Sequence, residues 1–153
     1  MICGSMTFSK EMVEARKRLE EMGYEVRIPV DAEMHVDDPS AIDDLDRNRQ
    51  HCIENQVMKT CFQYVADADA IVVLNFPKNG IDGYVGTAAL MEMGLAYHLG
   101  KKIYLLHPYP TPQEYRWALE ISVFQPTILH GSLDALERFH KSSPQSQREI
   151  AFA

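Results

Sequence analysis

The chain has 153 residues and a formal net charge of −7, and hydrophobic residues make up 46% of it. This length fits one domain with a core of its own. The negative charge argues against broad binding to nucleic acids or anionic membranes, because both need basic surfaces. No apolar run reaches membrane-spanning length, and three cysteines without paired spacing indicate reduced thiols in a cytoplasmic protein.

Strand-like and helix-like segments alternate along the chain. Apolar runs of strand length predict five strands, at residues 1–3, 24–29, 70–74, 103–106 and 127–129. Helical spacing of apolar residues predicts the intervening helices, at residues 8–22, 40–66 and 87–99, then from Thr111-Pro112 and from Ser132 to Phe139. The helix over 40–66 is either continuous or interrupted by the polar run 47–51. The acidic stretch 31–38 is predicted to be a loop. Residues 1–141 therefore form one domain, and residues 142–153 form a polar C-terminal tail.

This alternation predicts an α/β fold with a doubly wound, mostly parallel five-stranded sheet in a three-layer sandwich of flavodoxin-like or Rossmann-like type. Ligands of such sheets bind beyond the carboxyl ends of the strands, where the chain switches faces. With a flavodoxin-like order, this point lies between the first and third predicted strands. The loops at residues 4–7 and 75–86 should therefore border the site.

Glu92 is the most informative single residue. It lies in the segment 87–97, which is otherwise almost wholly apolar and should be buried on all sides. A buried carboxylate must be paired, hydrogen-bonded or neutralised, because its desolvation is costly. Glu92 therefore has either a structural partner or a chemical task. We expect its carboxylate in a cleft near Gly4 and Asn75.

Two segments carry a family resemblance. The opening Ile2-Cys3-Gly4-Ser5 resembles the start of the 2′-deoxynucleoside 5′-phosphate N-hydrolases. The segment 68–106, with Glu92-Met93-Gly94 at its centre, resembles the wider nucleoside 2-deoxyribosyltransferase superfamily. The resemblance implies that Glu92 is the catalytic nucleophile and that the protein is a homodimer. It also implies a catalytic aspartate about eight residues before Asp69, where ungapped counting finds Cys61.

Cleavage of an N-glycosidic bond passes through an oxocarbenium-like state, which a carboxylate such as Glu92 can stabilise or trap covalently. A second acid can protonate the departing base. Asp82 is the candidate, because it lies in the predicted cleft loop; its alternative role is that of a turn residue in Ile81-Asp82-Gly83. The acidic run 31–46 either closes over the substrate or forms a solvated face.

Two loops can meet a phosphate group. Gly4, Ser5 and Thr7 precede the first helix, and Gly86 and Thr87 open the Glu92 helix, so backbone amides at both places favour an anion. Helix capping explains the same hydroxyls equally well. No arginine accompanies either loop, so we expect a monophosphate to bind roughly two- to thirty-fold better than a free nucleoside, and a triphosphate to gain little more.

The remaining polar residues suggest no cofactor. The histidines lack metal-ligand spacing, and His35, His51, His98 and His107 are interpreted as surface or packing residues. We therefore expect no metal and no cofactor, and a small-molecule nucleoside or nucleotide as the partner.

The leading hypothesis is cleavage or transfer at the N-glycosidic bond of a (deoxy)nucleoside or its 5′-monophosphate. Glu92 and Asp82 are its catalytic residues, and the substrate-binding residues are Gly4, Ser5, Thr7, Asn75, Gly86 and Thr87. The alternatives are a non-catalytic nucleotide-binding module of the same fold and a hydrolase of another N-glycoside, such as a nicotinamide nucleotide.

Overall fold

The computed structural model describes residues 1–140, so the predicted domain end at residue 141 and the polar tail at 142–153 lie outside it. Within these residues the centre of the fold is a four-stranded, all-parallel sheet with the order β1-β2-β3-β4. Its strands are β1 (Ile2–Gly4), β2 (Ala70–Leu74), β3 (Lys102–Leu105) and β4 (Thr127–Ile128). All four end at the same edge, which we call the carboxyl edge.

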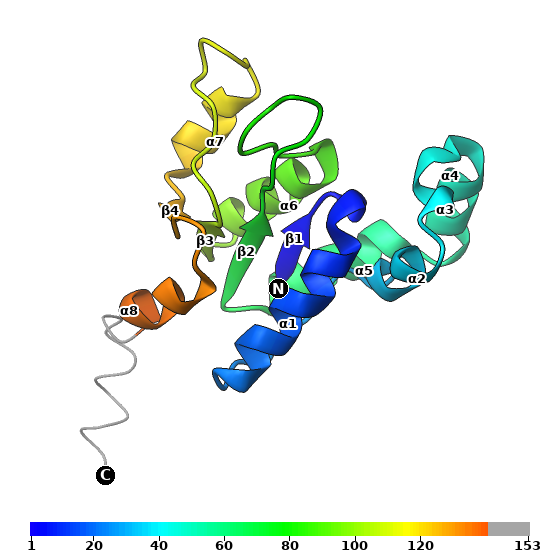
Figure 1. Cartoon of the computed structure of the whole chain (residues 1–153), viewed down its shortest axis with the longest axis horizontal. Helices are drawn as coiled ribbons and strands as arrows, with labels where there is room; N and C mark the ends of the chain where they lie inside the picture. Colours follow the sequence, from blue (N-terminus) through cyan, green and yellow to red (C-terminus); the bar gives the residue numbers. More distant parts are fainter. Residues whose placement is uncertain (141–153) are drawn as a thin grey trace.

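Helices cover both faces of the sheet (Figure 1). The elements of the first half are η1 (Met6–Phe8), α1 (Ser9–Glu21), α2 (Ala32–Asp37), α3 (Ser40–Asp43), α4 (Leu45–Glu54) and α5 (Val57–Asp67). Those of the second half are α6 (Thr87–His98), α7 (Ala118–Phe124), η2 (Leu133–Ala135) and α8 (Leu136–His140). Helices α2 to α4 stand to one side of the sheet (Figure 1).

Two apolar clusters make this a three-layer α/β fold. Met12, Ala15 and Leu19 recur at helical spacing along α1 and pack with Ile2 and Leu74 on one face of the sheet. On the other face of the sheet, strand residues pack against the buried sides of α5, α6 and α7. Strand β2 lies between the two layers, which is why its sequence is a continuous apolar run.

The prediction of five strands was wrong by one. Residues 24–29 form no strand, although the Arg27 carbonyl accepts a hydrogen bond of 2.8 Å from the Ile2 amide. This contact places the segment along the free side of β1. Among the described residues this is the one backbone hydrogen bond between the segment and β1, and a ladder needs more than one.

The helices also differ from the prediction. Most of the acidic stretch 31–38, expected to be a loop, forms α2. The single helix expected over 40–66 is divided into α3, α4 and α5. It breaks at Asp44, whose side chain accepts from the Arg47 amide and caps α4, and at Gln56, which has a positive φ of 49°. Thr111 and Glu114 form the hydrogen bonds of a capping box, yet the next helix, α7, begins only at Ala118.

The chain leaves β1 and β2 toward opposite faces of the sheet. After β1 it enters η1 and α1 on one face, and after β2 it reaches α6 on the other. The loops at residues 5–8 and 75–86 therefore flank the point where the direction of winding changes. This is the position at which open α/β sheets bind ligands.

Candidate functional site

Glu92 lies on the buried side of α6, at the end of β1. Its side chain belongs to the same face of the helix as Ala89, Met93 and Ala96, and the residue is only 6% exposed. The thiol of Cys3, in β1, is hydrogen-bonded to the Glu92 carboxyl. Cys3 is fully buried and directly precedes Gly4. The carboxyl therefore sits just below the carboxyl edge, with a weak thiol donor as its partner.

Burial dominates the electrostatics of this carboxyl. Loss of hydration raises the pKa of Glu92 to about 7, and the hydrogen bond from Cys3 lowers it by a smaller amount. The same burial, together with the charge of Glu92, raises the pKa of the Cys3 thiol well above its ordinary value. Glu92 thus changes between acid and carboxylate close to neutral pH, the range in which catalytic acids and bases operate.

The turn after β1 meets the loop after β2 through Lys78. Its ammonium donates to Ser5 Oγ at 3.0 Å and to Thr7 Oγ1 at 2.8 Å. Ser5 also caps η1, accepting at 3.4 Å from the Thr7 amide. Two hydroxyls, a helix start and one ammonium group therefore converge at the carboxyl edge. The prediction for these loops rested on the absence of arginine and did not include the Lys78 ammonium.

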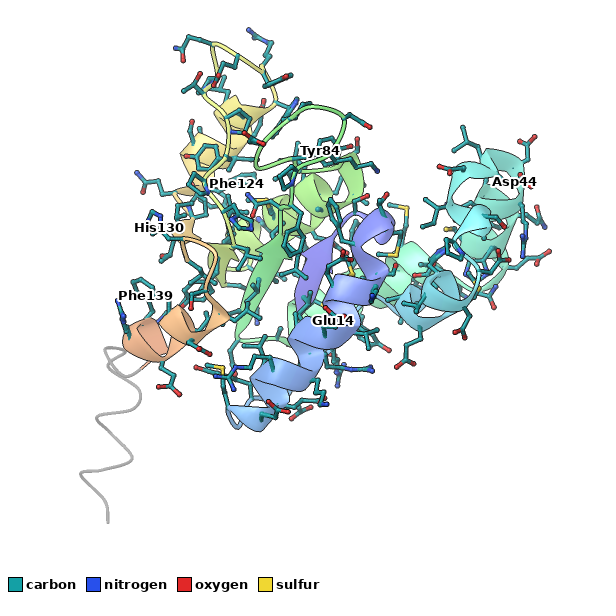
Figure 2. All side chains as sticks on the ribbon, in the orientation of Figure 1. Glu14, Asp44, Tyr84, Phe124, His130 and Phe139 are labelled. Carbon is teal, nitrogen blue, oxygen red and sulfur yellow. The ribbon has the colours of Figure 1, made fainter. Side chains whose placement is uncertain are left out.

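A tight hairpin fixes the direction of Lys78. The backbones of Lys78 and Ile81 exchange two hydrogen bonds, of 3.1 and 2.9 Å, around Asn79 and Gly80, which both have positive φ. Two such residues between the hydrogen-bonded pair are typical of a type I′ turn. The Asn79-Gly80 dipeptide is the sequence signal that would have predicted it. The Lys78 ammonium also lies 5.4 Å from the centre of the Tyr84 ring, which Figure 2 shows beyond the end of β2.

Gly83 anchors the same loop to the segment after β3. It has φ of 69°, and a Cβ built there would lie 2.0 Å from the Pro108 carbonyl oxygen. Only glycine fits this approach. Its neighbour Asp82 is exposed, so the predicted acid points out of the loop.

Asn75 joins the carboxyl ends of β2 and β3. Its side-chain amide donates to the His107 carbonyl at 2.7 Å and accepts from the His107 amide at 2.8 Å, and the residue is fully buried. Both ends of the amide are engaged by the backbone. The predicted substrate-binding residue Asn75 therefore holds the edge of the sheet together.

We expect Asn75→Ala to lower the free energy of unfolding by roughly 1–3 kcal/mol, because it leaves the His107 amide and carbonyl without partners. Asn75→Asp keeps the acceptor for the His107 amide but sets a buried carboxylate oxygen against the His107 carbonyl, so it should lose at least as much. Urea unfolding of the three proteins measures this. Equal stability of the alanine variant and the parent would show that water replaces both bonds.

The remaining predicted residues border the start of α6. Gly86 is the N-cap residue of the helix, and Thr87 is its first residue and is exposed. Gly86 has no side chain that could cap the helix, so no N-cap side chain occupies the backbone N–H groups of the first turn of α6, and a ligand could accept from them. Gly4, Ser5 and Thr7 lie across the switch point, at the end of β1.

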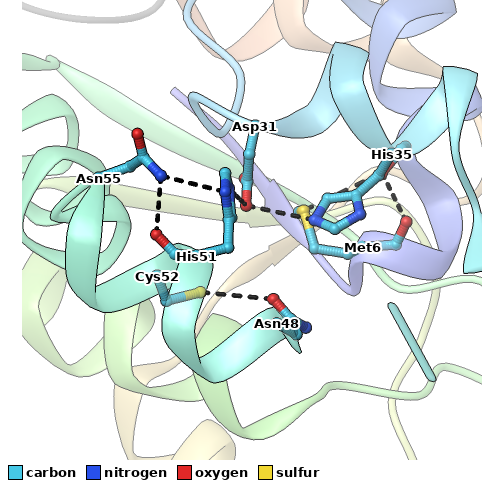
Figure 3. A network of polar contacts seen from close by, with 8 residues as sticks. Met6, Asp31, His35, Asn48, His51, Cys52 and Asn55 are labelled. Atoms are coloured by element: carbon cyan, nitrogen blue, oxygen red, sulfur yellow. Dashed lines mark hydrogen bonds and ion pairs between the residues drawn. The ribbon is translucent and has the colours of Figure 1, made fainter. Parts of the chain in front are cut away.

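A second polar cluster lies beside this edge, where the sequence predicted only surface or packing histidines. Figure 3 shows Asp31 between the rings of His35 and His51. His35 Nε2 is 3.2 Å from Asp31 Oδ2, and His51 Nε2 is 3.4 Å from the same oxygen. Asp31 and His35 are 6% and 2% exposed. The spacing of four residues from Asp31 to His35 in one helical turn was the available signal.

A cavity of about 220 Å³ lies at the opposite end of the sheet. Residues at the amino ends of β1 and β2 line it, with Tyr24, Arg27 and Tyr64 among them. None of Glu92, Lys78 and Asp31 contributes to its wall. The switch point lies at the other end, so we place the candidate site at the carboxyl edge despite the size of this cavity.

Residues 1–140 were compared with the requirements of a membrane-spanning helix and of a metal site. No helix there is long and apolar enough to cross a membrane. No group of three or more His, Cys, Asp or Glu side chains in this range is arranged to hold a metal ion. The three cysteines are free thiols.

Comparison of the chain with protein-family models, with curated proteins and with solved structures gave no match.

Proposed function

We propose that this protein cleaves or transfers the N-glycosidic bond of a (deoxy)nucleoside or its 5′-monophosphate, as a member of the nucleoside 2-deoxyribosyltransferase-like superfamily. In this proposal the segment 24–29 is the edge of a flavodoxin-like arrangement beside β1. The observation that carries the proposal is the buried Glu92 carboxyl, held by the Cys3 thiol just below the switch point. A carboxyl there with a structural role would normally have a basic partner, and no salt bridge among residues 1–140 includes Glu92.

The reaction follows from the position of Glu92. As the carboxylate, it attacks the anomeric carbon while the bond to the base breaks, and it forms a glycosyl ester. Water or an acceptor nucleobase then takes the sugar from the ester. Low hydration strengthens the attraction between the carboxylate and the positive charge that develops on the sugar.

The Lys78 ammonium, with Ser5 and Thr7, supports recognition of the 5′-phosphate. An ammonium and two hydroxyls offer donors to a phosphate at the carboxyl edge. A phosphate bound there would replace the hydrogen bonds that Lys78 now makes to the two hydroxyls. The sugar of the same ligand would extend toward Glu92.

Release of free base tests the proposed reaction. The protein is incubated with deoxynucleosides, ribonucleosides and their 5′-monophosphates, with and without a second free base as acceptor, and the products are separated by chromatography. Free base without acceptor indicates hydrolysis, and a new nucleoside indicates transfer. No product from any substrate would overturn the proposal.

We expect Lys78→Met to remove most of the advantage of a monophosphate over the free nucleoside. A charge-assisted hydrogen bond contributes about 1.5–3 kcal/mol, so the ratio of the two dissociation constants should fall roughly 10-fold or more. Calorimetric titration with both ligands measures it, and Lys10→Met, at an exposed position of α1, is the control. An equal loss for both ligands would mean that Lys78 supports the loop and not the phosphate.

A binding module without turnover is the second candidate. It is favoured by Cys61, which occupies the position where the resemblance places an aspartate. Burial raises the pKa of the Cys61 thiol to about 11, so this residue supplies neither a carboxylate nor a ready proton at neutral pH. Tight nucleotide binding without product would support this candidate.

A further inference from the structure

The cavity of about 220 Å³ at the amino ends of β1 and β2 takes no part in the proposed reaction. Its apolar wall belongs to the α1 side of the sheet and is formed by Ile2, Leu19, Val72, Tyr104 and Leu136. All five residues are buried. An apolar cavity of about 150 Å³ holds one benzene ring, so this cavity has room for a ring with a substituent.

The segment 24–29 forms another wall, through Tyr24 and Val26, and is joined to β1 by one backbone hydrogen bond among the described residues. This bond runs from the Ile2 amide to the Arg27 carbonyl. In a parallel ladder the next bond would run from the amide of residue 29 to the Ile2 carbonyl, but Pro29 has no N–H. With few bonds to the sheet, this wall is free to adjust to a ligand.

The charged groups of the lining leave no unpaired charge inside the cavity. The guanidinium of Arg27 lies 3.4 Å from the Asp67 carboxylate. The Met1 ammonium donates to a backbone carbonyl of β2 at 3.0 Å. Glu25 and Asp69 are exposed. A charged ligand would therefore lose hydration on entering the cavity without gaining a buried counter-charge.

The Tyr104 hydroxyl is the polar group that a ligand can meet on the apolar wall. Tyr104 lines the cavity and is only 3% exposed, and its hydroxyl makes no hydrogen bond within residues 1–140. Burial raises the pKa of this hydroxyl, and Tyr24 raises it further, so at neutral pH it is uncharged and can donate or accept. Buried polar groups are normally hydrogen-bonded, so this hydroxyl indicates a missing partner.

We infer that this cavity is a second binding site, for an uncharged compound of one aromatic ring that carries one hydrogen-bonding group. The inference does not depend on the proposed function. The ring of the ligand lies among those of Tyr24, Tyr64 and Tyr104, which line the cavity. Its polar group pairs with the Tyr104 hydroxyl. This site and the proposed reaction centre lie at opposite ends of the sheet.

Four probes test the inference: benzyl alcohol, toluene, benzylammonium and benzoate. They share one ring, and each charge is so close to the ring that it enters the cavity with it. Shifts of the backbone amide signals in nuclear magnetic resonance spectra measure the affinity and locate each probe. We expect saturable binding of benzyl alcohol with shifts in residues 24–27 and 68–72, and roughly 10-fold or more weaker binding of the two charged probes.

Tyr104→Phe removes the hydroxyl and keeps the ring. It should weaken the binding of benzyl alcohol roughly 2- to 12-fold and leave that of toluene unchanged, because only the alcohol can form the hydrogen bond. Tyr97→Phe, at an exposed position of α6, is the matched control and should change neither. Val26→Trp should weaken both, because the larger side chain fills the cavity. If Val26→Trp fails to fold in a melting test, the comparison with Tyr104→Phe still decides.

Three outcomes would overturn the inference. The first is a lack of saturable binding of benzyl alcohol, or shifts confined to residues away from the cavity. The second is tighter binding of benzoate or benzylammonium, which would assign the cavity to a charged ligand. The third is a Tyr104→Phe protein that loses affinity equally for benzyl alcohol and toluene or for neither, which would show that the hydroxyl does not meet the ligand.

Discussion

Glu92→Gln should abolish base release while the protein stays folded. The amide keeps the volume of the side chain but cannot form the glycosyl ester, so turnover should fall roughly 10³-fold or more, as it does when a covalent nucleophile is removed. In the wild-type protein the rate should rise as pH increases through about 7, because the carboxylate is the reactive form. Rates of base release from pH 5 to 9 measure both effects.

Glu120→Gln is a matched control for this variant, because Glu120 is an exposed carboxylate of α7, away from the switch point. It should leave the rate unchanged. Melting curves separate catalysis from folding. A loss of activity together with a fall of roughly 3–5 kcal/mol in stability would indicate that Glu92 has a buried structural partner and is not the nucleophile.

The stability of the wild-type protein should fall relative to that of Glu92→Gln as pH rises from about 4.5 to about 7. The folded protein raises the pKa of Glu92 from 4.5 to about 7, so the folded state holds the proton more tightly than the unfolded chain does. Below pH 4.5 both states are protonated, and the carboxyl contributes no difference. Above pH 7 both are ionised, and the buried charge costs the folded state about 3 kcal/mol.

Thermal melting of both proteins at pH 4.5 and pH 8 measures this difference. The melting temperatures should agree more closely at the lower pH, and Glu92→Gln should melt roughly 6–12 °C higher at pH 8. The two proteins share all their other titratable groups, so the effects of those groups cancel in the difference between the two melting temperatures. A gap that is the same at both pH values would mean that the Glu92 carboxyl is hydrated or paired in the folded protein.

The sequence by itself determined the α/β class with its parallel sheet, and the burial of Glu92. The apolar run at Ala70–Leu74 predicted β2 with its observed bounds, and the apolar segment after Gly86 predicted α6. Both are local patterns, because a strand buried on two faces and a helix apolar on all sides need no information from distant residues. A carboxylate in such a helix is buried wherever the helix packs.

Only the tertiary structure decided how many strands pair and where the helices break. The segment 24–29 has strand composition, but it makes a single backbone hydrogen bond to β1, and whether a ladder forms depends on how the two segments approach each other. The breaks at Asp44 and Gln56 depend on a side-chain cap and on a left-handed residue. The polar run 47–51 indicated an interruption of the helix predicted over 40–66 but marked neither position.

The composition of the site was also decided by the tertiary structure. Lys78 meets Ser5 and Thr7 across more than seventy residues of chain, and Asn75 bonds to His107 in a different strand connection. His51 reaches Asp31 from another helix. Contacts between residues distant in sequence leave no periodic signal in either segment, so the sequence indicated which loops flank the switch point but not which side chains meet there.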